Sequence, residues 1–216
     1  MTGVAEAVPP LLLTLAMLAG LAAGHYARHL AAAFDPADTA PPCRPPVLLE
    51  SLTALVFGAL TWRFGVTPEL ALYLFVATIG VALAAIDLRH RLLPNAVVMP
   101  ALGVVAVLVL AAAVAGADGG AAIRAVVGAV LLFVLYLVLA LINPAGLGMG
   151  DVKLAALLGL ALAFDGWTTL MTGAFLGFAV GAVISVGVLL TRRGGLRSSF
   201  PFGPAMLAGA LVACFV

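Results

Sequence analysis

Charge is what this sequence has least of. Only 9% of its 216 residues are Asp, Glu, Lys or Arg, whereas 65% are hydrophobic and the mean hydropathy is +1.27. A soluble domain of this length would be about half apolar and a quarter charged. These values indicate an integral membrane protein with almost no soluble part. With so few cations, we expect no basic surface for nucleic acid.

Cysteine and histidine are also scarce. The two cysteines, Cys43 and Cys214, are far apart and form no CxxC pair, so neither a zinc site nor a disulfide framework is predicted. His25 and His29 lie one helical turn apart, but His90 is the only other histidine. Because a metal site needs more such ligands, we expect no metal to be bound.

The first apolar run, Pro10–Ala27, follows a segment with Glu6 and no basic residue. A secretory signal peptide would begin with a positively charged region. The run is therefore expected to be a retained first span.

Long, uniformly apolar runs predict an all-α fold, a polytopic bundle of about eight transmembrane helices. A spanning helix needs about 20 apolar residues, and these runs lack the alternation of membrane β-strands. The sixth run is short, and its boundary with the seventh is the least defined. The expected spans are Pro10–Ala27, Pro46–Trp62, Pro68–Ile86, Asn95–Ala115, Ala122–Ile142, Val152–Phe164, Thr168–Leu190 and Phe200–Val216.

Residues 1–45 are expected to form the first span and a short cytoplasmic loop, and residues 46–216 a membrane-embedded core. Proline- and glycine-rich segments near residues 35–42, 116–120 and 192–195 predict turns between spans. We find no internal repeat.

Basic residues are distributed unequally between the two sets of loops. With eight spans, one set holds only Arg63 and Arg124, and the other holds eight cations. By the positive-inside rule the second set is cytoplasmic, and both termini lie outside. The cytoplasmic cations are Arg28, Arg44, Arg89, Arg91, Lys153, Arg192, Arg193 and Arg197.

Two aspartates lie at the edges of apolar runs, on the face predicted to be cytoplasmic. They are Asp87, after the third run, and Asp151, before the sixth. A carboxylate in or near lipid is costly and usually functional. Two carboxylates that meet at one face can share a proton and perform acid/base chemistry.

Each aspartate also has a structural interpretation. Asp87 could pair with Arg91 one turn further on, as in an ordinary loop. Asp151 could be the N-cap of the sixth span, with Lys153 as its counter-ion. Capping alone does not explain the glycines that precede Asp151, which allow close approach of a backbone or a substrate strand: Gly146, Gly148 and Gly150.

Four segments, in order along the chain, carry a resemblance. They are Pro46–Leu55, which contains Glu50; Ile86–Asn95, with Asp87 followed by basic residues and Leu-Pro; Gly148–Leu154, which reads GxGDxKL; and Pro201–Pro204, Pro-Phe-Gly-Pro. This ordered set resembles the prepilin peptidases, or type IV leader peptidases, which are membrane aspartic proteases of the GxGD kind.

The resemblance implies an endopeptidase that cleaves the leader of type IV prepilins or pseudopilins at the cytoplasmic face of a prokaryotic cell membrane. It implies that Asp87 and Asp151 are a catalytic pair that activates water. For Glu50 we expect a supporting rather than a catalytic role. The other supporting or substrate-binding candidates are Gly148, Gly150, Lys153 and Arg91.

The chain departs from many family members in one respect. Those members carry a cytoplasmic insert with two CxxC pairs and also methylate the new pilin N-terminus, using S-adenosylmethionine. Here the matching loop, Arg28–Pro45, holds only Cys43. The peptidase itself needs no cofactor, and S-adenosylmethionine is expected only if methylation is retained.

Three alternatives stay open at this point: a bifunctional peptidase and N-methyltransferase, a proton-coupled membrane transporter, and a structural subunit of a secretion assembly. A transporter would place its polar groups near the middle of the bilayer. The expected partners are pilin substrates and membrane lipid, and not nucleic acid. The sequence determines neither the oligomeric state nor which pilin is cut.

Overall fold

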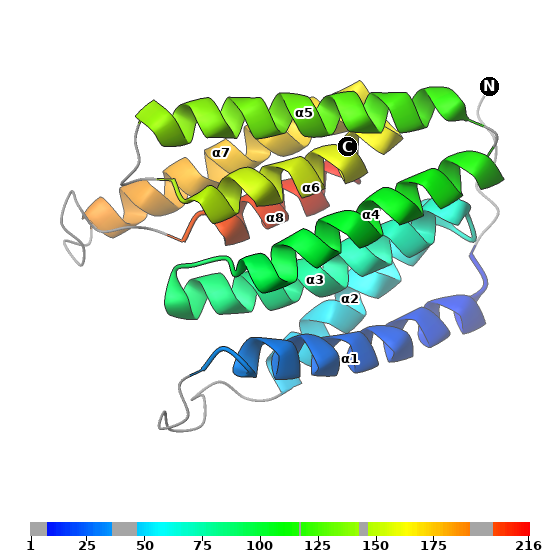
Figure 1. The fold of residues 1–216 in the computed structure, drawn as a ribbon. Helices are drawn as coiled ribbons and strands as arrows, with labels where there is room; N and C mark the ends of the chain where they lie inside the picture. Colours follow the sequence, from blue (N-terminus) through cyan, green and yellow to red (C-terminus); the bar gives the residue numbers. More distant parts are fainter. Residues whose placement is uncertain (1–7, 36–46, 117, 143–146, 191–200) are drawn as a thin grey trace.

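The chain folds as a bundle of helices in the computed structural model (Figure 1), which describes residues 8–35, 47–116, 118–142, 147–190 and 201–216. No strand occurs in these ranges, so the all-α prediction is confirmed. The helices are α1 (Pro10–Ala32), α2 (Val47–Phe64), α3 (Pro68–His90), α4 (Asn95–Ala115), α5 (Gly119–Ile142), α6 (Met149–Asp165), α7 (Trp167–Leu190) and α8 (Gly203–Ala213).

Each expected span corresponds to one helix, and among the described residues six helices are long and apolar enough to cross a membrane. The chain is a multi-pass membrane protein. The exceptions are α6, with 17 residues, and α8, with 11. At 1.5 Å per residue α8 is only about 16 Å long, so it reaches roughly half-way across a hydrocarbon core of about 30 Å. The predicted span Phe200–Val216 was therefore too long, because the helix ends at Ala213.

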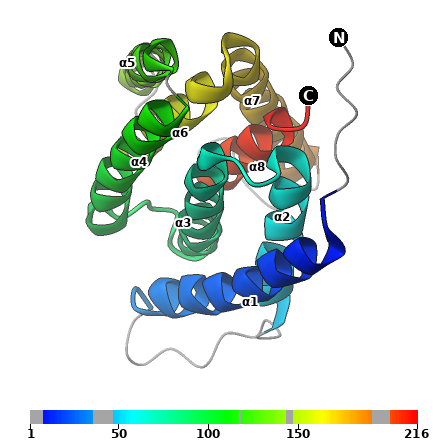
Figure 2. The ribbon, with the colours of Figure 1, turned by 90° about the vertical axis from the view of Figure 1, so that its right-hand side faces the viewer.

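Successive helices run in opposite directions, so their connections gather at the two ends of the bundle. The end of α3, the beginning of α4 and the beginnings of α6 and α8 all lie at the left end in Figure 1. Helix α6 lies inside the bundle, packed against α4, α5, α7 and α8, and nearly all of its residues are buried. Helix α1 lies on the outside, against α2 and α3 (Figure 2).

Glycines allow two of the tightest helix contacts. A Cβ atom placed on Gly20 of α1 would lie 2.6 Å from Cα of Ala54 on α2, and one on Gly24 would lie 2.6 Å from Cα of Glu50. A Cβ on Gly159 of α6 would lie 2.7 Å from Cα of Ala129 on α5. Small residues at such positions bring membrane helices close enough for their backbones to pack directly.

Two residues with positive φ end helices. Gly65 (φ 64°) follows α2, and its N–H donates to the carbonyl of Thr61. Arg91 (φ 53°) follows α3, and its N–H donates to the carbonyl of Asp87 at 2.8 Å. A left-handed conformation is unfavourable for a residue other than glycine and is often found near functional sites. Helix α3 extends one turn beyond the predicted end at Ile86, so Asp87 lies in its last turn.

Several residues singled out in the sequence lie outside the ranges that the structure describes. They are Cys43, Arg44, Gly146, Arg192, Arg193 and Arg197.

Candidate active site

Asp87 is buried at the end of α3, with 4% of its surface exposed. The N–H of Gly203, the first residue of α8, donates to its Oδ2 atom at 3.0 Å. A Cβ atom on Gly203 would lie 2.8 Å from the same oxygen, so only glycine permits this contact without displacing the carboxylate. The Pro-Phe-Gly-Pro segment thus begins α8 directly against Asp87.

Asp151 is also buried, with 9% exposed, in the first turn of α6. The alternative interpretation of Asp151 as the N-cap is wrong, because Gly148 holds that position. Asp151 lies three residues later, and its Oδ2 atom accepts the N–H of Gly148 at 3.0 Å. This is the backward half of a capping box, which satisfies an N–H that the helix itself leaves unpaired.

Leu93, on the connection between α3 and α4, contacts a residue close to each of the two aspartates. A Cβ atom on Gly150 would lie 2.7 Å from Cβ of Leu93, and one on Gly203 would lie 3.5 Å from Cδ1 of Leu93. The buried side chain of Leu93 therefore contacts the residue before Asp151 and the residue that holds Asp87. The structure thus brings the two carboxylates to one end of the bundle.

Burial changes the protonation of Asp151, which lies in the first turn of α6, before its apolar residues. Burial raises the pKa of its carboxyl from the ordinary value near 3.8 to about 6. The Gly148 N–H lowers the pKa, and the negative charge of Asp87 raises it. A carboxyl in this range is protonated for part of the time near neutral pH, which suits acid/base chemistry.

The nearby cations pair with other residues. Nζ of Lys153 donates to Oδ1 of Asn95 at 2.7 Å, so Lys153 is not placed as a counter-ion of Asp151. Nη1 of Arg89 lies 2.6 Å from a carboxylate oxygen of Asp35. Arg91 is exposed, and neither candidate aspartate has a salt bridge within the described ranges. The Asp87–Arg91 pair, the alternative structural interpretation of Asp87, is therefore not formed.

Glu50 lies at the same end of the bundle but in a separate cluster between α1 and α2. Its Oε1 atom is 2.8 Å from Nε of Arg28 and 3.8 Å from Nδ1 of His25. Arg28 and His29 are each hydrogen-bonded to the ring of His25. The cluster links α1 to α2, and the supporting role expected for Glu50 stays a prediction.

The described side chains include no group of three or more His, Cys, Asp or Glu residues that could hold a metal ion. The two residues that sequence reasoning missed are Gly203 and Leu93. Gly203 stood within the recognised Pro-Phe-Gly-Pro segment, which was the only available signal for it. Leu93 is part of the Leu-Pro that follows the basic stretch, and its sequence alone looks like an ordinary apolar residue.

Residues 72–186 match the type IV leader peptidase family, and both aspartates fall inside that range. The chain belongs to this family. The match covers the part of the chain from α3 to α7, which supplies both carboxylates.

Curated relatives named "Prepilin leader peptidase/N-methyltransferase" are similar over about three quarters of the chain. The protein of Pseudomonas aeruginosa is 32% identical over 166 residues, which are 77% of this chain and 56% of that protein. The protein of Bacillus subtilis is 31% identical over 168 residues, 76% and 63% respectively. That of Aeromonas salmonicida is 36% identical over 170 residues, 77% and 56%.

The chain thus spans somewhat more than half of the length of the curated relatives it matches. No solved structure matches the chain significantly.

Proposed function

We propose that this protein is a membrane aspartic endopeptidase that removes the leader of type IV prepilins or pseudopilins. The observation that carries the proposal is the pair of buried aspartates at one end of the bundle. Each carboxylate is held by one glycine N–H and, within the described ranges, has no cation as a partner. Membership of the leader peptidase family, and the names of its relatives, favour a peptidase over a transporter or a structural subunit.

In the proposed mechanism, Asp151 and Asp87 share one proton and hold a water molecule between them. The ionised carboxylate takes a proton from the water, whose oxygen bonds to the carbonyl carbon of the scissile peptide. The protonated carboxyl hydrogen-bonds to the carbonyl oxygen. As the C–N bond breaks, a proton passes to the leaving amine, so that water is consumed and the pair returns to its starting state.

The glycine contacts would orient this pair. The Gly203 N–H binds Oδ2 of Asp87 and the Gly148 N–H binds Oδ2 of Asp151, which leaves both Oδ1 atoms for the water. Because burial raises the pKa of Asp151 to about 6, this carboxyl can hold a proton near neutral pH. The negative charge of Asp87 raises the pKa of Asp151, so we expect the two carboxyls to titrate as a unit.

The proposed site of cleavage is the cytoplasmic face. Arg28, Arg89 and Lys153 belong to the helix ends on the side of the aspartates, whereas Arg63 and Arg124 belong to the opposite helix ends. This distribution agrees with the positive-inside rule. A cysteine at exposed Met149 should be protected from a membrane-impermeant thiol reagent in intact cells, whereas one at exposed Val66 should react, in a Cys43→Ser background.

The decisive test is cleavage of a co-expressed prepilin by Asp87→Asn and Asp151→Asn. Each variant should insert and fold but lose activity by about 1,000-fold or more, since acid/base catalysis is worth about 10²–10⁴-fold. The double variant should be no worse than either single one, because the two groups act as a unit. Asp165→Asn, at the other end of α6, is the matched control. Near-normal cleavage by either of the first two variants would refute the acid pair.

The names of the relatives also include an N-methyltransferase. For this chain, methylation with S-adenosylmethionine as the donor stays an alternative to a peptidase without a second activity. Mass measurement of the mature pilin N-terminus reports the position of the cut and the presence of a methyl group together.

A further inference from the structure

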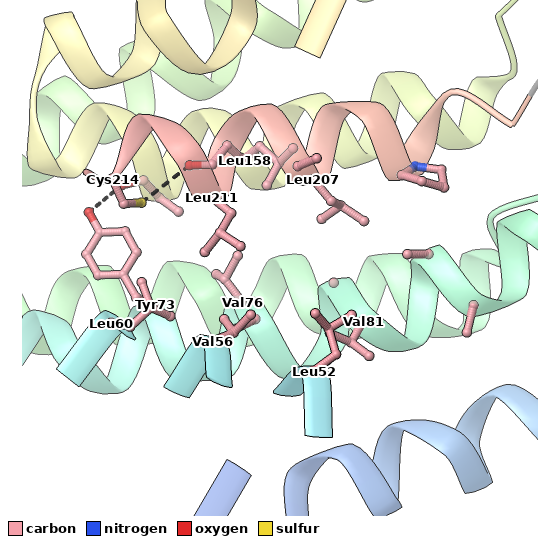
Figure 3. Close-up of a pocket in the computed structure, with 18 of the residues that line it drawn as sticks. Leu52, Val56, Leu60, Tyr73, Val76, Val81, Leu158, Leu207, Leu211 and Cys214 are labelled. Carbon is pink, nitrogen blue, oxygen red and sulfur yellow. Dashed lines mark hydrogen bonds between the residues drawn. The ribbon is translucent and has the colours of Figure 1, made fainter. Parts of the chain in front are cut away.

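The bundle contains two buried tyrosines, and within the described ranges only one of them uses its hydroxyl in the fold. Tyr73 on α3 is 3% exposed, and its hydroxyl donates to the carbonyl of Ala161 on α6 at 3.1 Å (Figure 3). Tyr136 on α5 is 2% exposed, and no described residue forms a hydrogen bond with its hydroxyl. Burying a hydroxyl without a partner is costly, and phenylalanine would fill the same space without that cost. Packing alone therefore does not explain the hydroxyl of Tyr136.

The packing of α5 against α6 brings Tyr136 level with Asp151. A Cβ atom on Gly159 of α6 would lie 2.6 Å from the carbonyl oxygen of Gly128 on α5, so these two glycines face each other. The two helices are antiparallel (Figure 1). Asp151 lies eight positions before Gly159, and Tyr136 lies eight positions after Gly128, which is about 12 Å along each helix. The two groups are close enough for the negative charge of Asp151 to act on the Tyr136 hydroxyl.

The ring of Tyr136 packs against the segment that holds the other aspartate. Its centroid lies 5.1 Å from that of Phe178 on α7 and 6.2 Å from that of Phe202, and the rings of Phe178 and Phe202 are 5.7 Å apart. Phe202 directly precedes Gly203, whose N–H donates to Asp87. Three rings in mutual contact leave Tyr136 little freedom to turn. Tyr136 is therefore fixed next to residues that surround both aspartates.

A buried phenol at this place suits a hydrogen-bond donor rather than a base. A neutral tyrosine carries one O–H that can donate, and it keeps this proton at neutral pH. When water adds to the scissile peptide, the carbonyl oxygen gains negative charge. Donors that are already in position stabilise this charge, since they need no rearrangement during the reaction. In the proposed mechanism the protonated carboxyl is one such donor, and a tetrahedral oxyanion can accept another.

We propose that the Tyr136 hydroxyl is this second donor. It hydrogen-bonds to the carbonyl oxygen of the scissile peptide, most strongly in the tetrahedral intermediate, and keeps its proton throughout the reaction. This inference rests on the proposed function. It accounts for a hydroxyl that has no partner among the described residues, because the partner arrives with the substrate. Tyr136 adds a residue of α5 to a site otherwise built from α3, α6 and α8.

The first experiment compares Tyr136→Phe with the wild type on purified prepilin in detergent. The substitution keeps the ring and its contacts with Phe178 and Phe202, and it removes the oxygen alone. We expect kcat to fall by about 10- to 100-fold, as for the loss of a hydrogen bond to a charged oxygen. KM should stay within about 2-fold of the wild-type value, because the lost bond is made chiefly in the transition state.

Tyr73→Phe is the matched control, because it removes a buried hydroxyl that has a partner. It should lower the apparent melting temperature by about 2–4 °C, the loss expected for one hydrogen bond in a chain of this length, and leave kcat per folded molecule unchanged. Tyr136→Phe should show the opposite pattern, with a melting temperature equal to or above that of the wild type. A fall as large as that of Tyr73→Phe would make the Tyr136 hydroxyl part of the fold and overturn the inference.

The pH dependence of kcat distinguishes a donor to the substrate from a residue that acts through Asp151. If the hydroxyl bonded to the ionised carboxylate of Asp151, its removal would raise the apparent pKa of the pair and shift the profile toward higher pH. Loss of a donor to the substrate oxygen lowers kcat by the same factor at every pH. We therefore expect the profile of Tyr136→Phe to keep its midpoints. A shifted profile would overturn the catalytic role in favour of a positioning one.

The two aspartate variants, measured beside Tyr136→Phe, separate this inference from the proposed function. Loss of activity in all three variants, with Tyr136→Phe as stable as the wild type, is the expected result. Inactive Asp87→Asn and Asp151→Asn together with an unchanged kcat for Tyr136→Phe would remove the second donor and leave the peptidase. Cleavage by the aspartate variants at the wild-type rate would remove the proposed function, and this inference with it.

Discussion

The two ends of the bundle both carry acids but use them differently. At the end opposite the acid pair, Oδ1 of Asp118 accepts the N–H of Ala121 at 2.9 Å and Oδ2 of Asp165 accepts the hydroxyl of Thr169 at 2.6 Å. Both acids are exposed and line a polar cavity of about 410 Å³ that also contains Arg63 and Arg124. There Asp118 accepts an N–H in the first turn of α5 and Asp165 accepts a side-chain hydroxyl of α7, with two cations nearby.

At the other end, Asp87 and Asp151 are buried, and the cations around them bind Asn95 and Asp35 instead. A buried carboxylate without a cation has a raised pKa and costs stability, whereas an exposed capping acid contributes stability. Acids at both ends accept hydrogen bonds from residues near helix starts, so these bonds do not distinguish the two ends. The two ends differ in the burial of their acids and in the position of the nearby cations.

The largest effect expected from changing one side chain other than the aspartates comes from Gly203→Ala. The new Cβ atom would lie 2.8 Å from Oδ2 of Asp87 and would displace the carboxylate, since Gly203 itself has an ordinary backbone conformation. We expect cleavage to slow by about 100-fold or more, because a displacement near 1 Å can cost that much. The measurement is kcat at saturating substrate.

Gly119→Ala, at the opposite end, is the control for this substitution, since a Cβ atom there would meet nothing within 4 Å. It should leave kcat unchanged. If Gly203→Ala also left kcat unchanged, the contact with Gly203 would not be what positions Asp87 for catalysis.

Asp151→Asn should stabilise the protein while abolishing activity, and the gain should depend on pH. The pKa of Asp151 is about 6 in the folded protein and near 3.8 ordinarily. The protonated carboxyl therefore destabilises nothing below pH 3.8, and the free energy of unfolding of the wild type falls as pH rises from there through 6. The difference corresponds to about 3 kcal/mol at most. The apparent melting temperature of the variant in detergent should exceed that of the wild type by an amount that grows from pH 4 to pH 7.

Asp165→Asn removes a carboxylate from the exposed end of the same helix and should lack this stabilisation. A melting difference for Asp151→Asn that is constant across pH would contradict the raised pKa.

Arg124→Ala should affect the opposite end, and stability rather than chemistry. Nε and Nη2 of Arg124 donate to the carbonyls of Ala163 and Phe164 at 2.7 and 2.6 Å, where α6 ends. Their loss leaves helix-end carbonyls without a donor and should cost about 1.5–3 kcal/mol. The melting temperature should fall, and kcat per folded molecule should stay unchanged. A fall in kcat instead would show that the two ends are coupled.

The sequence was sufficient for the number, order and direction of the helices, because apolar length alone marks a membrane helix. It was less informative about where helices end. The polar residues after Ile86 looked like a loop, yet they complete the last turn of α3, which Arg91 closes in a left-handed conformation. The extent of α8 also escaped, since apolar residues continue beyond its end at Ala213.

For the candidate site, the alternating direction of successive spans was enough to place Asp87 and Asp151 at one end of the bundle. The hydrogen bond from Gly203 to Asp87 joins residues 116 positions apart, and the one from Lys153 to Asn95 joins residues 58 apart. Neither follows from local pattern, because each depends on which helices become neighbours.

The smallest effect is expected from Lys153→Ala. Sequence pattern made Lys153 a supporting residue, but its ammonium group binds Asn95 at an exposed position. Exposed interactions of this kind are worth about 1 kcal/mol or less, so cleavage should change by less than about 5-fold. Asn95→Ala should have the same small effect, and the double variant no more than either. A loss of 100-fold for Lys153→Ala alone would mean that the lysine turns to the carboxylates when substrate binds, and that the aspartate end gains a cation during catalysis.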